Sequence, residues 1–408
     1  MSNIPTNVEQ SCASHPRLKP GAALPRNGVA DISQRRLFAL GTLTLQTSTK
    51  PTLATYDLVE DRWTSLQGIY ADWLQFEPDQ IVTDATGETL TKLSEVVGVA
   101  LGVAALDAEF EIQINRFERF NPGGSARRVD FGYFADGERF FHETKGTTYD
   151  EKVQGMCDSI AGQKESTLET LGSTPPVPGT MPVNVSGLTG SVSLYRHITR
   201  PTTSCLITLI DPPAGPQEGT RRATEGDELA CVLRYYRNFY RVTLRKTKNV
   251  SSIRLDQWLD QVIDGLEIGS PAPGHAPNNL RTNARVRDPR NPNSPYAGTI
   301  FDARFARRSL LRYDNLRVAT ESIQAPISFL GVSEEVTEMI HRCRWDDLLS
   351  YRDPLAVSAN DREILESGVL CETIEPAELN YPDSPKNFES LRRAALLTQP
   401  NPNESSGP

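Results

Sequence analysis

Three charged residues within the segment 126–146, Asp130, Glu143 and Lys145, have the side chains needed for metal-assisted chemistry. Carboxylate oxygens are ligands that Mg²⁺ or Mn²⁺ prefers, and the backbone carbonyl of Thr144 would add a further oxygen. A bound ion polarises a phosphoryl oxygen and lowers the pKa of a bound water, while Lys145 would orient that water or offset charge developing on the phosphate. These residue types indicate hydrolysis of a phosphodiester bond, for which a nucleic-acid backbone is the natural substrate.

The segment that carries these residues has the pattern of a β-hairpin. Charged or small residues alternate with apolar ones over 128–134, and a second strand is predicted over 139–145. The Asp-Gly pair in the turn between the two runs is a strong hairpin signal. Because side chains alternate between the faces of a strand, Glu143 and Lys145 must share a face, and Asp130 can point to the same side.

Further elements are predicted on both sides of the hairpin. The segment 37–45 is predicted to be a strand, and 86–107 a helix that is buried because its second half is apolar nearly all round. Glu95 stands at the edge of that apolar run, where a carboxylate needs a partner or a metal unless it lies on a solvated first turn. The alternation over 109–120 predicts a half-buried strand, and 150–171 reads as a second helix.

The predicted order is a helix with a glutamate, a strand, a strand with an aspartate, a strand with Glu-x-Lys, and a helix. This order and the sequences VDFGY and FFHETKG resemble the PD-(D/E)xK nuclease superfamily, which includes many restriction and repair endonucleases. The resemblance covers 86–171. It implies an α/β (α+β) restriction-endonuclease-like core with a mixed central sheet, in which Asp130 and Glu143 bind Mg²⁺ or Mn²⁺ and Lys145 assists the attacking water. Glu95 falls where many members carry an additional helical carboxylate.

Two departures from the family pattern and one alternative accompany this resemblance. Val129, rather than proline, precedes Asp130, and the Gln-x-x-x-Tyr element of exonuclease-like branches is absent after Glu-x-Lys. A lone aspartate followed by Glu-x-Lys also occurs by chance, and the three charges would then form an ion-pair ladder on the surface of a hairpin. His142 must point away from Glu143, so we interpret it as a packing residue rather than a ligand.

The length of 408 residues allows two or three domains. Composition predicts a disordered tail over 1–35, a nuclease-like domain over 36–172, a Pro- and Gly-rich linker over 173–190, and an α+β module over 191–375 that binds nucleic acid or a partner. A polar tail over 376–408 follows.

Composition also restricts the class of protein. The six cysteines are scattered and include no C-x-x-C pair, which indicates reduced thiols rather than a zinc site or a disulfide framework. No apolar run approaches the roughly 20 residues that span a bilayer, and the N-terminus lacks an apolar signal core. We therefore expect a cytoplasmic protein, or a nuclear one in a eukaryote, with no membrane partner. The net charge of -9 argues mildly against nucleic-acid binding.

Two basic segments in the C-terminal half are nevertheless candidate nucleic-acid contacts. The segment 229–248 is predicted to be a basic strand whose arginines are interleaved with aromatic residues, which suits phosphate contact and base stacking. The segment 281–317 is rich in arginine and poor in acids. The candidate contacts are Arg234, Arg237, Arg241, Arg245, Arg285, Arg287, Arg307 and Arg308. The alternative is a solvated strand face with the aromatic residues in the core.

The sequence thus favours a metal-dependent endonuclease that hydrolyses DNA or RNA, in restriction or anti-phage defence, as a homodimer or with a protein partner. One alternative is a catalytically inactive nuclease-like scaffold that binds nucleic acid or a protein, and another is a viral or phage structural protein. The intact set of Asp130, Glu143 and Lys145 weighs against the inactive scaffold.

Overall fold

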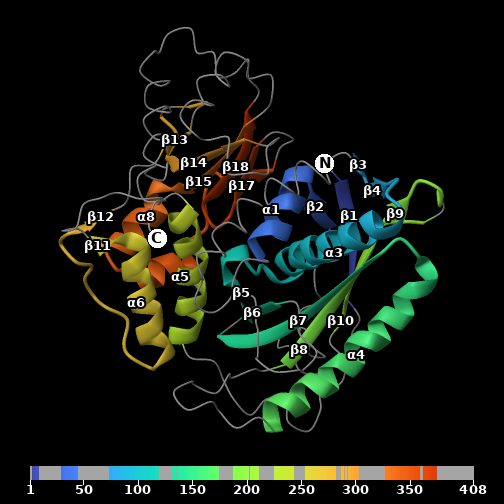
Figure 1. Cartoon of the computed structure of the whole chain (residues 1–408), viewed down its shortest axis with the longest axis horizontal. Coiled ribbons are helices and arrows are strands. Elements are labelled where there is room, and N and C mark those ends of the chain that lie inside the picture. The colour runs from blue at the N-terminus through green and yellow to red at the C-terminus, as the bar shows by residue number, and fades with distance from the viewer. Residues whose placement is uncertain are drawn as a thin grey trace, which may run out of the picture.

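The chain is a mixed α/β protein with two large sheets and helices packed against them (Figure 1). The computed structural model describes residues 2–8, 29–44, 73–118, 131–135, 137–173, 187–201, 203–210, 225–242, 253–281, 286–288, 290–291, 293–302, 327–358 and 362–374.

The larger sheet has seven strands and contains the predicted hairpin. From one edge to the other its strands are β2 (Val29–Ile32), β1 (Ser2–Val8), β10 (Leu206–Ile210), β8 (Gly187–Leu194), β7 (Glu138–Thr147), β6 (Phe131–Ala135) and β5 (Phe117–Glu118). Strand β7 is parallel to β8 and β1 is parallel to β10, whereas the other neighbours are antiparallel. Gly137 closes the hairpin between β6 and β7 with a φ of 74°, as the Asp-Gly pair predicts.

Two long helices cover opposite faces of this sheet (Figure 1). They are α3 (Gly87–Phe110) and α4 (Asp150–Ser173), and both confirm predicted helices. Gly102 of α3 lies against Thr144 of β7, whereas Ile160 of α4 lies against Gly190 of β8. Helix α4 is the crossover that the parallel pair β7 and β8 requires. Among the described helices, α3 alone is long and apolar enough to cross a membrane, and most of its apolar stretch is buried inside the protein.

Helix α1 (Gln34–Thr44) packs against α3 and also contacts the second large sheet. The hydroxyl of Ser33 caps it by accepting a hydrogen bond of 2.9 Å from the backbone N–H of Arg36. Gly41 lets the two helices approach, because a Cβ there would lie 3.2 Å from Val96. The predicted strand at 37–45 is therefore wrong: residues up to Thr44 are helical, and Leu37 is buried together with Leu40 and Gly41, which follow it by three and four positions, the helical period.

The contact between α3 and β7 depends on two glycines that face each other. A Cβ on Gly98 of α3 would lie 2.8 Å from the backbone nitrogen of Gly146, and a Cβ on Gly146 would collide with the carbonyl oxygen of Ser94. These atoms belong to backbone and cannot rotate away. The glycine after Glu-x-Lys thus sets how closely the helix approaches the strand that carries the candidate site.

We expect Gly146→Ala to destabilise the protein by about 2–3 kcal/mol, because it overpacks a backbone-to-backbone contact. Gly155→Ala is the matched control, since a Cβ there meets nothing within 4 Å and alanine favours a helix by about 0.5–1 kcal/mol. Urea unfolding of both variants measures the difference. Equal stability of Gly146→Ala and wild type would show that α3 does not approach β7 this closely.

A small sheet and a second large sheet complete the fold. The small sheet has the order β3 (Leu74–Glu77), β4 (Gln80–Thr83) and β9 (Arg196–His197). The second large sheet has six strands in the order β13 (Val286–Arg287), β14 (Tyr296–Asp302), β15 (Ile327–Ser333), β18 (Val369–Ile374), β17 (Arg362–Leu365) and β16 (Val357–Ser358).

Four further helices lie near the second large sheet. They are α5 (Glu225–Val242), α6 (Leu255–Glu267), α8 (Glu334–His341) and α9 (Trp345–Ser350). A short strand pair is formed by β11 (Ile253–Arg254) and β12 (Leu280–Arg281).

The two large sheets share one hydrophobic core, which includes residues from Ile4 of β1 to Cys371 of β18. Hydrogen bonds cross the same junction: the amide of Gln113 donates to the carbonyl of Tyr351 at 3.0 Å, and the guanidinium of Arg116 donates to the carbonyl of Leu349 at 2.8 Å. The described parts of the two predicted domains are therefore packed together.

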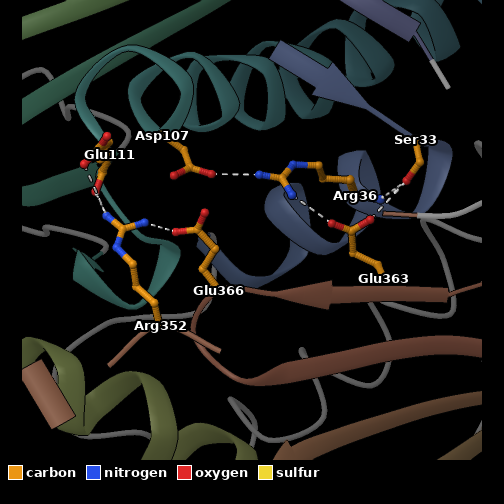
Figure 2. A network of polar contacts seen from close by, with 7 residues as sticks. All are labelled: Ser33, Arg36, Asp107, Glu111, Arg352, Glu363 and Glu366. Atoms are coloured by element: carbon orange, nitrogen blue, oxygen red, sulfur yellow. Dashed lines mark hydrogen bonds and ion pairs between the residues drawn. The ribbon is translucent and has the colours of Figure 1, made fainter. Parts of the chain in front are cut away.

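A buried polar network lies at this junction (Figure 2). Arg36 of α1 donates to Asp107 of α3 at 2.7 Å and to Glu363 of β17 at 2.9 Å. Nearby, Arg352 forms an ion pair with Glu366. Burial raises the pKa of Asp107 to about 6, against the attraction of Arg36. Arg36 thus links α1 and α3, which pack with the first large sheet, to β17 of the second.

The predicted domain boundaries are wrong. Strand β8 begins inside the expected linker 173–190 and pairs in parallel with β7, so the sheet continues through it. The expected tail 1–35 contains β1 and β2, which extend the same sheet. The sequences of β8 (GLTGSVSL) and β1 (SNIPTNV) are polar or glycine-rich, and strand pairing rather than local propensity makes them strands. The expected tail 376–408 lies outside the described residues.

The strand predicted at 109–120 is also wrong for most of its length. Helix α3 continues to Phe110, and Glu111 ends it with a left-handed φ of 57°. A 3-10 turn, η3 (Ile114–Arg116), follows, and only the two residues of β5 are extended in the sheet. The apolar residues that suggested a strand, Phe110, Ile112 and Ile114, are buried, but at the end of the helix and in this irregular segment rather than in a strand.

Candidate active site

Glu143 and Lys145 lie on the same face of β7, which is the face that α4 covers. Their register partners on β8 are Gly190 and Val192, and Val192 packs with Ile160 of α4. The ammonium group of Lys145 forms an ion pair with Oε1 of Glu143. The Glu143 side chain is 4% exposed and that of Lys145 is 29% exposed. A carboxylate is thus buried in the sheet, and its cation reaches solvent.

Burial of Glu143 follows from the glycine beside it. Gly190 is opposite Glu143, and Ile160 of α4 lies so close to Gly190 that a Cβ there would be 2.6 Å from the isoleucine side chain. The helix therefore sits directly on the sheet next to the carboxylate. A buried carboxylate costs folding free energy unless a partner compensates it. The interpretation as an ion-pair ladder on the surface does not describe Glu143.

The opposite face of β7 carries His142 in a buried polar cluster. Its Nδ1 is 2.8 Å from the hydroxyl of Thr189 and its Nε2 is 3.0 Å from the hydroxyl of Ser191. The ring stacks on Phe131 with centroids 5.1 Å apart. The prediction that His142 points away from Glu143 and packs inside the protein is confirmed.

The other members of the predicted site are Asp130, Thr144 and Glu95. Asp130 lies outside the described residues; in the sequence it directly precedes Phe131, which pairs with His142. The side chain of Thr144 faces α3, where its methyl lies beside Gly102. Glu95 is exposed on α3, on the face of the sheet opposite to Glu143. The structure therefore brings Glu143 and Lys145 together and places Glu95 on a helix that covers the other face.

The oxygen donors at Glu143 suit a hard divalent cation in type. Mg²⁺ keeps several waters and is usually bound through one or two carboxylates together with substrate phosphates. Glu143 supplies one carboxylate, and the carbonyl of Thr144 is adjacent in the chain. No group of three or more His, Cys, Asp or Glu side chains gathers within the described ranges. A two-carboxylate site here would need Asp130.

No family model matches the chain, and no curated protein or solved structure is significantly similar to it.

The segment predicted to be a basic strand is largely the helix α5. Its aromatic residues recur at helical spacing and face the core. They are Tyr235, Tyr236, Phe239 and Tyr240. The predicted alternation was a misinterpretation of two adjacent helical rows, since residues i, i+1, i+4 and i+5 share one face of a helix. The alternative that placed these aromatic residues in the core is confirmed for them, although on a helix rather than a strand.

Two of the arginines on α5 are bound to acids inside the protein. Arg234 donates to Glu118 at 2.6 Å and also pairs with Glu267. Arg237 is 5% exposed and donates to Asp260 at 3.0 Å. These pairs join α5 to β5 and α6. The interpretation of Arg234 and Arg237 as phosphate contacts is therefore wrong.

The other candidate arginines are not tested by the described side chains. Arg245, Arg285, Arg307 and Arg308 lie outside the described residues, and only the backbone is described for Arg241 in α5 and Arg287 in β13. They remain predictions.

Other cations near the candidate site were missed by sequence reasoning. Arg200 follows β9, and Lys152 lies in the first turn of α4. Both stand over the ring of Tyr149, the second residue after the end of β7. The position of Lys152 early in a predicted helix was a usable signal. Nothing in the sequence connects Arg200 to Tyr149, since the contact depends on how β9 is placed beside the end of β7.

Proposed function

We propose that this protein is a metal-dependent nuclease that hydrolyses phosphodiester bonds of DNA or RNA. The observation that carries the proposal is the buried Glu143 beside a partly exposed Lys145 on one face of β7. A carboxylate and an ammonium in this arrangement offer a cation ligand and a positive charge for phosphate at one place.

The order of elements supports a restriction-endonuclease-like core. Helix α3 is followed by three antiparallel strands, β5 to β7, then by α4 and by β8 parallel to β7. This is the order that the resemblance to the PD-(D/E)xK superfamily implies, with Glu-x-Lys on the third strand. Glu95, on the opposite face, is not part of the proposed site in this arrangement.

In the proposed site, Glu143, the carbonyl of Thr144 and Asp130 would hold Mg²⁺ or Mn²⁺. When bound, the ion would supply Lewis-acid activation of a phosphoryl oxygen and of a water. Lys145, with 29% of its side chain exposed, would donate a hydrogen bond to that water or to the phosphate as negative charge develops on it. Without substrate, the same ammonium neutralises the buried carboxylate.

We expect the purified full chain to cleave DNA or RNA in Mg²⁺ or Mn²⁺ and to lose this activity in EDTA. Labelled duplex DNA, single-stranded DNA and RNA, each resolved on denaturing gels, measure it. Cleavage that survives EDTA would contradict the metal requirement. Absence of cleavage on every substrate and with either metal would favour the inactive scaffold instead.

The proposed setting is restriction or another defence against phage, with the enzyme in the cytoplasm. It rests on the resemblance to restriction endonucleases alone. A homodimer, which would allow both strands of a duplex to be cut, belongs to the same proposal, and the molecular mass in solution tests it.

A further inference from the structure

A cluster of cations lies at the end of the strand that carries the candidate site. The guanidinium carbon of Arg200 is 3.3 Å from the centroid of the Tyr149 ring, and Nζ of Lys152 is 4.2 Å from the same centroid. Arg200 also donates to the carbonyl of Thr148 at 3.1 Å, which fixes it beside the end of β7. Two cations are thus held over one aromatic ring, an arrangement that the ring quadrupole favours.

The cluster lies four residues along the chain from Lys145, just beyond the end of the same strand. Tyr149 is the second residue after Thr147, the last residue of β7, and Lys145 precedes Thr147 by two positions, about 7 Å along the strand. The start of α4 and the turn after β9 meet at this end of the sheet (Figure 1). Lys145 and the residues that carry the cluster, Thr148, Tyr149 and Lys152, therefore lie within one short stretch of chain at the end of β7, where Arg200 joins them.

These cations are accessible and have few competing acids. Lys152 is exposed, and Tyr149 and Arg200 are half-buried. Within the described part of the chain, no carboxylate forms an ion pair with Arg200 or Lys152. Asp150 and Glu151 are close in the sequence, but they occupy the first turn of α4, where acids stabilise the helix N-terminus. By contrast, Arg234 and Arg237 form ion pairs with Glu118 and Asp260 inside the protein.

We propose that Arg200 and Lys152 bind the phosphodiester backbone of a nucleic acid and align it with Lys145. The contact is to backbone rather than bases, because the ring of Tyr149 that could stack on a base already carries the two cations. Binding should therefore not depend on base sequence. The position of this surface beside the cleavage site rests on the proposed function, but the binding itself does not.

The test measures binding of the full chain to fluorescein-labelled nucleic acid in EDTA, by anisotropy at several salt concentrations. Duplex DNA, single-stranded DNA and duplex RNA of mixed sequence form the three arms. We expect Arg200→Ala and Lys152→Ala each to weaken binding about tenfold near 0.1 M salt, and each to flatten the slope of log K against log salt by about 0.9 on duplex DNA. Arg342→Ala is the control, because it removes an exposed arginine that pairs with Glu338 on α8.

The outcomes separate this proposal from the nuclease proposal. Binding by wild type that neither variant weakens, or no binding on any arm, would overturn the phosphate surface, whatever the cleavage assay shows. Binding that depends on Arg200 and Lys152 without any cleavage would support the surface and contradict the nuclease. If Arg200→Ala fails to fold, Lys152→Ala alone decides, since that side chain is exposed. Binding of an acidic peptide in place of nucleic acid would likewise contradict the proposal.

Discussion

Replacing Glu143 by glutamine is expected to slow metal-dependent phosphodiester cleavage by at least about 100-fold, because the amide cannot replace a carboxylate as ligand for a hard cation. The same loss is expected for Lys145→Met, which removes the positive charge near the reacting phosphate. Single-turnover rates on the substrate that wild type cleaves best measure both effects. Thermal unfolding of each variant shows whether the fold is retained.

The matched control for these variants is Glu88→Gln. Glu88 forms an exposed ion pair of 2.8 Å with Lys92 on α3, so this variant also removes a carboxylate from a lysine pair, but at the surface. Its cleavage rate should equal that of wild type. Cleavage at the wild-type rate by folded Glu143→Gln and Lys145→Met would show that the activity resides elsewhere. The same comparison with Asp130→Asn tests the predicted second ligand, which the described residues do not include.

Replacing Arg36 by methionine is expected to destabilise the protein by about 3–5 kcal/mol at pH 7–8, because it leaves two acids without their shared cation. The Glu363 carboxylate is fully buried, and Asp107 is 18% exposed. An exposed pair has a much smaller effect, about 0–1 kcal/mol. Arg342→Met, which breaks such a pair with Glu338, is therefore the control. Chemical denaturation measures both variants.

The effect of Arg36→Met should also depend on pH. Burial raises the pKa of Asp107 to about 6 and raises that of Glu363, with Arg36 opposing both shifts. Removing the guanidinium should raise these folded-state pKa values further. The folded variant then binds protons that the unfolded chain does not. Its deficit in stability relative to wild type should therefore be largest above the raised pKa values and should shrink as pH falls through them toward about 6, where Asp107 of wild type also becomes protonated. A deficit that is the same at pH 5 and pH 8 would mean that the two carboxyls do not titrate in this range.

Local pattern was sufficient for the elements around the candidate site. Alternation and the Asp-Gly turn specified the hairpin that contains Glu143 and Lys145, because a period of two and a turn with positive φ are properties of a few adjacent residues. The helices α3 and α4 were equally clear from their length and apolar spacing. The shared face of Glu143 and Lys145, and the opposite direction of His142, followed from strand geometry alone.

Only the tertiary structure decided the rest. Strands β1 and β8 have weak local propensity and are extended because neighbouring strands pair with them. Arg234 and Arg237 resembled a basic surface in the sequence, and their acid partners became visible only when α5, α6 and β5 were assembled. The burial of Glu143 under α4 and the place of Arg200 beside Tyr149 likewise depend on contacts between segments far apart in the chain. Such contacts follow from the packing of whole elements, whereas the spacing of residues within an element is set locally.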